Sequence, residues 1–197
     1  MLTRSLSPLA LALTLTLAPA VLAGQASDRL AGERLTLAAA FGGLSAAADL
    51  NDAGTAEWRL GWAASVDATY WLHPLVGLRA SGSWAQDSVR AGNLVGRGKF
   101  NKFAYDGGVV LRYPVGAGSG TLIPYVLGGA GAISVHQLGS DSTWTKFAGN
   151  FGAGVEYRFG RWGLRAEGRD YVYTFDRHGF EKTQHDVAWQ GGVTLSF

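Results

Sequence analysis

Apolar and polar residues alternate along most of the chain after residue 32. Every second residue from Leu60 to Leu72 is apolar, while Arg59, Asp67 and Thr69 lie on the opposite face. A period of two is typical of a β-strand with two different faces. The same pattern predicts eight strands, at 33–42, 58–72, 76–84, 102–113, 121–135, 147–159, 162–169 and 186–197.

The lengths of these strands favour a membrane environment. A tilted strand needs about 9–11 residues to cross the hydrocarbon, whereas strands of soluble proteins usually have about 5–6. The connections alternate between tight turns at 73–75, 116–120 and 160–161 and long polar stretches at 43–57, 86–101, 137–145 and 175–185. Short turns on one side and long loops on the other are typical of outer-membrane barrels. We therefore expect both termini in the periplasm and the loops outside.

The amino terminus has the pattern of a secretory signal peptide. Arg4 supplies a positive charge, Leu9–Leu17 form an apolar stretch, and Ala20–Ala23 provide small residues before Gly24. The apolar stretch is short for a transmembrane anchor, which needs about 20 residues. The predicted organisation is a signal peptide over 1–23, a periplasmic lead over 24–32 and one barrel domain over 33–197.

Composition agrees with an exported β-protein. The 29 glycines oppose long helices, and the absence of cysteine fits an exported protein that does not depend on disulfides. Seventeen Lys and Arg nearly balance 15 Asp and Glu, which argues against nucleic acid as a partner.

Two arrangements fit the alternation, because a soluble barrel turns its apolar face inward and a membrane barrel turns it outward. The polar face carries both charge signs, which can pair inside a barrel, whereas a Lys or Arg facing the lipid midplane costs about 2–4 kcal/mol. This favours the membrane arrangement. The predicted lumen charges are Arg34, Arg59, Asp67, Arg79, Lys102, Asp106, Arg112, Glu156, Arg158, Arg165, Glu167 and Arg169.

Aromatic residues gather near the predicted strand ends, as expected for two interfacial girdles. Those near the turns are Tyr70, Tyr113, Tyr157, Phe159 and Phe197, and those near the loops are Trp58, Trp62, Trp84, Phe103, Tyr105, Phe147 and Trp189. Since an open sheet edge cannot be satisfied in hydrocarbon, the last strand must pair with the first. Asp170 is an exception, because alternation places it on the lipid face; a bulge or a position at the outer interface would accommodate it.

Three stretches resemble the small outer-membrane barrel family that includes the OmpA transmembrane domain, OmpX and the opacity-type proteins. They are Ile123–Ala132, Gly152–Phe159 with Leu164–Glu167, and Val193–Phe197. The resemblance covers residues 33–197 and implies an all-β, eight-stranded, antiparallel, up-and-down transmembrane barrel. It also implies that Val193, Leu195 and Phe197 form the signal read by the outer-membrane assembly machinery.

For function, we expect a structural or surface-interaction role through four extracellular loops, with the lumen plugged by charged side chains and outer-membrane lipids and lipopolysaccharide as partners. Arg90, Arg97 and Lys99 in one loop could meet lipid phosphates. A narrow channel for small or hydrophobic solutes is the alternative, because small inward residues such as Ala63 and Gly108 leave some room.

A lipid-modifying enzyme is the weakest of the three hypotheses. Ser134 and His136 share a strand face, but no third catalytic residue is identifiable, and ordinary polar groups of the lumen explain both. The last loop gathers Asp176, His178, Glu181, His185 and Asp186 without a metal-binding spacing. We therefore expect no enzymatic activity, catalytic residue, metal or cofactor.

Overall fold

The computed structural model describes residue 30 and residues 32–46, 56–91, 98–115, 120–137, 143–177 and 180–197. The predicted signal peptide lies outside these residues. The described strands are β1 (Leu35–Ala46), β2 (Ala56–His73), β3 (Val76–Ala91), β4 (Gly98–Arg112), β5 (Thr121–Gln137), β6 (Thr143–Phe159), β7 (Trp162–Arg177) and β8 (Phe180–Ser196).

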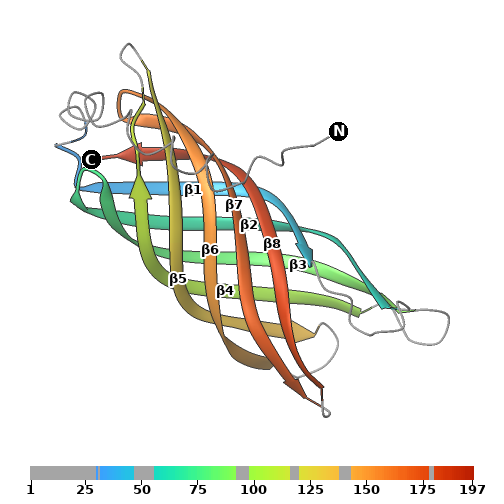
Figure 1. Ribbon diagram of the computed structural model, residues 1–197. Helices are drawn as coiled ribbons and strands as arrows, with labels where there is room; N and C mark the ends of the chain where they lie inside the picture. Colours follow the sequence, from blue (N-terminus) through green and yellow to red (C-terminus); the bar gives the residue numbers. More distant parts are fainter. Residues whose placement is uncertain are drawn as a thin grey trace, which may run out of the picture.

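Each strand pairs with its neighbour in sequence, and β8 pairs with β1, so the sheet closes (Figure 1). All eight pairings are antiparallel. The predicted eight-stranded antiparallel barrel is confirmed. No helix among the described residues is long and apolar enough to span a membrane.

The strands extend further into the predicted loops than alternation indicated. Strand β3 continues to Ala91 and β4 begins at Gly98, while β7 continues to Arg177 and β8 begins at Phe180. The predicted loops 86–101 and 175–185 are therefore largely strand. Main-chain pairing causes the difference, because it needs no apolar face; Asp176 pairs with Glu181 in this extension.

The strands are inclined to the barrel axis. Starting from Leu35 on β1, the paired residue on each next strand can be followed once around the barrel. This row of paired residues comes back to β1 at Ser45, much further along the strand than Leu35. Such a stagger is what closing a small barrel requires, with a tilt of about 35–45°. We call the end of the barrel with the turns at 74–75 and 160–161 the turn end, and the opposite end the loop end.

Close approach of neighbouring strands explains some of the glycines. An added Cβ at inward Gly108 would lie 2.5 Å from the Gly128 carbonyl oxygen. At the turn between β6 and β7, Gly160 adopts a φ of 63°, a left-handed conformation that favours glycine. Both chain ends of the barrel meet at the turn end, where the Phe197 amide donates to the Leu35 carbonyl at 2.8 Å.

Candidate functional site

The interior of the barrel, its lumen, is filled at the turn end by a group of paired charges. Glu33, just before β1, accepts hydrogen bonds from Arg112 at 3.3 Å and from Arg158. Arg158 also donates to Glu156 at 2.7 Å. The Arg112 guanidinium lies over the Trp71 ring, 3.5 Å from its centroid. Residues of β2, β4 and β6 and the lead segment thus meet at this mouth of the lumen.

A second group of charges lies deeper in the lumen and has Glu167 at its centre. Glu167 accepts hydrogen bonds from Arg79 at 2.7 Å, from Arg169 at 2.8 Å and from the Tyr125 hydroxyl at 2.8 Å. All of these side chains are buried. Arg169 also contacts Asp106, with 3.2 Å between Nη1 and Oδ2.

Asp67 joins a further pair to this group. It receives two parallel hydrogen bonds from Arg165, at 3.0 and 2.5 Å, and its Oδ1 lies 3.5 Å from Arg79 Nε. The Asp67 and Arg165 side chains are 1% and 3% exposed. A two-pronged guanidinium–carboxylate contact fixes geometry as well as energy, so β2, β3 and β7 are tied together across the lumen. We call the two groups together the lumen network.

Towards the loop end the lumen becomes mostly apolar. Lys102 donates to Asp186 at 2.7 Å, and the Tyr173 hydroxyl donates to the same carboxylate at 3.1 Å. The surrounding buried cluster is Leu44, Ala63, Ala85, Ile133, Val135, Ala148, Tyr171, Tyr173 and Ala188. A cavity of about 20 Å³ remains between Lys102, Asp186 and this cluster, which is room for about one water molecule.

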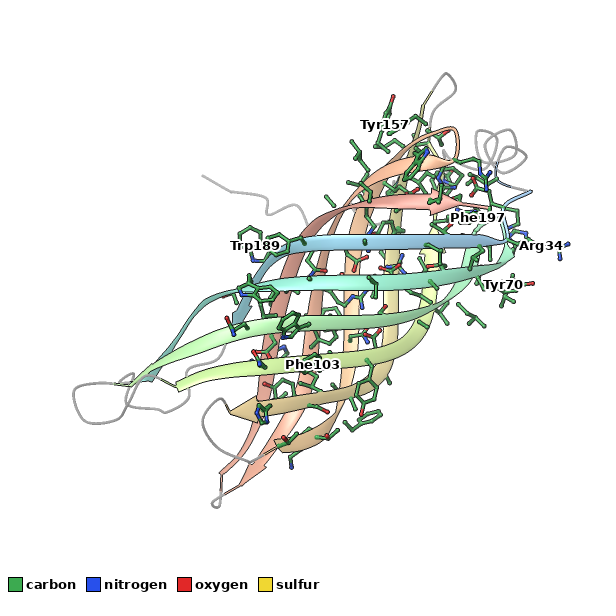
Figure 2. All side chains as sticks on the ribbon, turned by 180° about the vertical axis from the view of Figure 1, so that it is seen from behind. Arg34, Tyr70, Phe103, Tyr157, Trp189 and Phe197 are labelled. Carbon is green, nitrogen blue, oxygen red and sulfur yellow. The ribbon has the colours of Figure 1, made fainter. Side chains whose placement is uncertain are left out.

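The predicted lumen charges have three different fates. Asp67, Arg79, Lys102, Arg112, Glu156, Arg158, Arg165, Glu167 and Arg169 are buried, and Asp106 lies among them with a side chain 7% exposed. The Arg59 side chain lies outside the described residues. Arg34 is exposed at the rim of the turn end, which corrects its assignment to the lumen (Figure 2). Alternation ends where strand pairing ends, and Arg34 precedes β1.

Several partners in the lumen were not predicted from the sequence. Glu33 and Asp186 complete ion pairs, although one precedes the first strand and the other lay next to a predicted loop. Tyr125 and Tyr171 supply hydroxyl groups that contact Glu167 and Arg169. On β5 both faces are apolar, so alternation alone could not place Tyr125 inside. Tyr171 lies beyond residue 169, where the sequence predicted the end of its strand.

The outer face carries large apolar side chains. Rings at the loop end form a ladder across four strands: Phe41 stacks on Trp62 at 6.1 Å, Trp62 meets Trp84 edge-on at 4.9 Å, and Trp84 stacks on Phe103 at 5.9 Å. At the turn end, Tyr70, Tyr157 and Phe197 are about half exposed and point outward (Figure 2). These are the two ends at which interfacial girdles were predicted.

Ser134 and His136 do not face the lumen, which corrects the expectation that they are lumen polar groups. Their neighbours Ile133 and Val135 point inward and are buried, so the two polar residues point outward. Ser134 Oγ lies 2.8 Å from Thr145 Oγ1, and His136 Nδ1 lies 2.9 Å from Thr143 Oγ1. Each is paired with β6 rather than with the other.

Asp170 also points outward, as alternation indicated. Pairing of β7 with both neighbours continues without a register shift at this position, so a bulge does not explain its charge. Its Oδ2 lies 2.8 Å from His185 Nδ1 instead. Among the described residues, no group of Asp, Glu and His is arranged to hold a metal ion.

Comparison with known proteins identifies the family. The model of the outer membrane protein beta-barrel domain matches residues 9–197. The chain belongs to this family. The protein is therefore a bacterial outer-membrane β-barrel, and its apolar outer face is the lipid-facing surface. No curated protein sequence matches the chain.

Solved structures support the same fold. Neisserial surface protein A has a TM-score of 0.62 at 14% identity, and the match covers 83% of this chain and 97% of that one. The outer membrane protein OprG from Pseudomonas aeruginosa has a TM-score of 0.57 at 13% identity, with 84% and 96% covered. At these identities the likeness shows the fold alone.

Proposed function

We propose that this outer-membrane barrel is closed to solutes and acts as a structural or surface-interaction protein without enzymatic activity. The observation that supports the closed state is the lumen network. Its hydrogen bonds connect β2, β3 and β7 through Asp67, Arg79, Arg165 and Glu167. An eight-stranded barrel is just wide enough for side chains to fill.

The energetics support a network that stays in place. Each charge would cost several kcal/mol to bury alone, and mutual pairing with additional hydrogen bonds offsets that cost. To open a pore, Arg165 would have to leave Asp67 and Glu167 would have to release both arginines and Tyr125. The barrel is therefore a closed scaffold that displays its loops.

Planar-bilayer recordings test the closed state. We expect the refolded protein to give no current steps above the bare bilayer. A variant with both Asp67→Ala and Arg165→Ala removes a whole ion pair, but the turn-end charges and the loop-end apolar cluster still fill the lumen, so it should also stay silent. Gly107→Ala on the lipid face is the matched control and should stay silent. Steady conductance by the unmodified protein would refute the closed barrel.

A second candidate is a pathway for small hydrophobic solutes through the apolar cluster around Leu44 and Ile133 at the loop end, which would have to rearrange because only about 20 Å³ is free there. Proteoliposome uptake of a small apolar solute decides between the two functions. Uptake above that of protein-free liposomes, in the absence of ion current, would favour the second.

The orientation and partners belong to the same proposal. The termini at the turn end lie in the periplasm and the loops lie outside, where they meet lipopolysaccharide. Val193 and Phe197 are exposed on the lipid side of β8 and Leu195 lies between them, in the arrangement expected of the segment that the assembly machinery reads. Labelling of a cysteine placed in the 92–97 connection of intact cells tests the orientation.

A further inference from the structure

A hollow of about 790 Å³ lies on the lipid-facing surface over β6, β7 and β8. Its floor consists of residues with little or no side chain. Ala153 on β6 pairs with Gly168 on β7, and Ala166 on β7 pairs with Gly191 on β8. A second run of small outward residues, Ala80, Gly107, Ala130 and Gly149, crosses β3 to β6, so the small floor alone does not define the site.

Large side chains border the hollow. Phe41 and Trp189 rise on the β1–β8 side, with 63% and 54% of their surface exposed, and Val155 rises on β6. Trp189 is seen on the outer surface of the barrel in Figure 2. The hollow is wide open towards the lipid, so a bound chain would be covered by the barrel on one side only.

A polar pair marks the loop-end limit of the hollow. Asp170 is the next outward residue after Gly168 on β7, and its partner His185 lies on β8. Asp170 pairs with Val187 on β8, which is the next outward residue beyond Trp189 towards the loop end, where the interfacial aromatic residues gather. The pair is therefore at the membrane interface, directly beyond the apolar hollow.

The chemistry of this pair suits a hydroxyl-bearing headgroup. A carboxylate accepts hydrogen bonds, and an imidazole can donate one. The His185 side chain is 43% exposed, so its ring is accessible from the membrane side. Asp170 Oδ1 is buried without a hydrogen-bond partner among the described residues, so a headgroup hydroxyl would contact the pair through the exposed imidazole. None of the described residues that line the hollow is basic.

We propose that the hollow binds an acyl chain of lipopolysaccharide, with a sugar hydroxyl of its headgroup on the Asp170–His185 pair. The choice of this lipid rests on the orientation proposed above, which places the loop end in the outer leaflet. A second copy of the barrel fits the site poorly, because Phe41 and Trp189 protrude and would hold two rigid cylinders apart. A flexible chain can enter between them.

The test is native mass spectrometry of the refolded protein in detergent micelles with added lipopolysaccharide. An added Cβ at Gly168 meets no atom within 4 Å, so Gly168→Leu fills the hollow without disturbing the barrel. We expect this variant to lose about tenfold in lipid affinity. Gly107→Leu is the matched control, because its Cβ would meet only the Arg79 carbonyl oxygen at 4.0 Å. It should bind as the unmodified protein does.

The headgroup contact has its own comparison. Asp170→Asn should weaken lipopolysaccharide binding and leave unchanged the binding of phosphatidylcholine, whose headgroup carries no hydroxyl. Equal retention of lipopolysaccharide by the unmodified protein and Gly168→Leu would overturn the proposal, as would equal retention of the two lipids by the unmodified protein. A Gly168→Leu variant that turns a dimer into a monomer would assign the hollow to a second copy instead. Binding in micelles depends neither on membrane orientation nor on conductance, so its failure is distinguishable from failure of the proposed function.

Discussion

Removing the Glu167 carboxylate is the most informative perturbation of the lumen network. In Glu167→Ala, Arg79, Arg169 and Tyr125 each lose an acceptor within 2.8 Å. Breaking a buried ion pair from one side costs about 3–5 kcal/mol, because an uncompensated charge stays buried. Arg79 keeps Asp67 nearby at 3.5 Å and Arg169 keeps a second carboxylate at 3.2 Å, so we expect the lower end of that range.

Loss of the Tyr125 hydrogen bond adds about 1 kcal/mol. The expected destabilisation is thus about 4 kcal/mol. Urea-induced unfolding from lipid vesicles, followed by tryptophan fluorescence, measures it. With a slope of about 2 kcal/mol per M, the midpoint falls by about 2 M.

The control is Gly107→Ala, which changes the lipid face and should shift stability by less than about 0.5 kcal/mol. Combining Glu167→Ala with Arg79→Met in one protein tests whether these two side chains interact directly. If Glu167 and Arg79 interact as described, the two losses are not additive and their coupling exceeds about 0.5 kcal/mol. A Glu167→Ala midpoint indistinguishable from that of Gly107→Ala would refute a network that holds the lumen together.

Two other outcomes are expected from packing and pairing. Gly129→Ala should destabilise the barrel by about 1–3 kcal/mol, because the new Cβ would lie 2.8 Å from the Gly108 Cα. Gly128→Ala, whose nearest neighbour would be at 3.9 Å, should be neutral, and a thermal gel-shift assay compares the two variants. Lys102→Met should cost about 3 kcal/mol by leaving Asp186 buried without its cation. Adding Asp186→Leu to that variant should restore most of the stability in urea, and a double variant as unstable as the single one would contradict the pairing.

Alternation in the sequence was sufficient to predict the fold and the direction of most side chains. A closed barrel in lipid needs strands whose outer face is apolar throughout, and only a period of two provides it. Strand β4 shows this clearly, because Phe103 and Tyr105 are exposed while Lys102 is buried, as the pattern indicated. Strand ends were less well predicted, since main-chain pairing continues beyond the membrane where side chains no longer need to alternate in polarity.

Alternation failed where both faces of a strand are similar. In the loop half of β5, small and apolar residues lie on both sides, so the sequence did not distinguish the lumen position of Ile133 from the outward position of Ser134. The Arg34 error has a different origin. The chain leaves the sheet at this point. A charge at the rim stays hydrated there, so it does not need to face the lumen.

Only the tertiary structure decided which charges pair. Arg165 and Asp67 are 98 residues apart in the chain, and Arg158 and Glu33 are 125 apart. Their contacts depend on the stagger with which the sheet closes, because that stagger sets which inward positions share a level in the lumen. The hollow over β6–β8 has the same origin. Its small residues are scattered in sequence, and the register between neighbouring strands brings them together beneath Asp170 and His185.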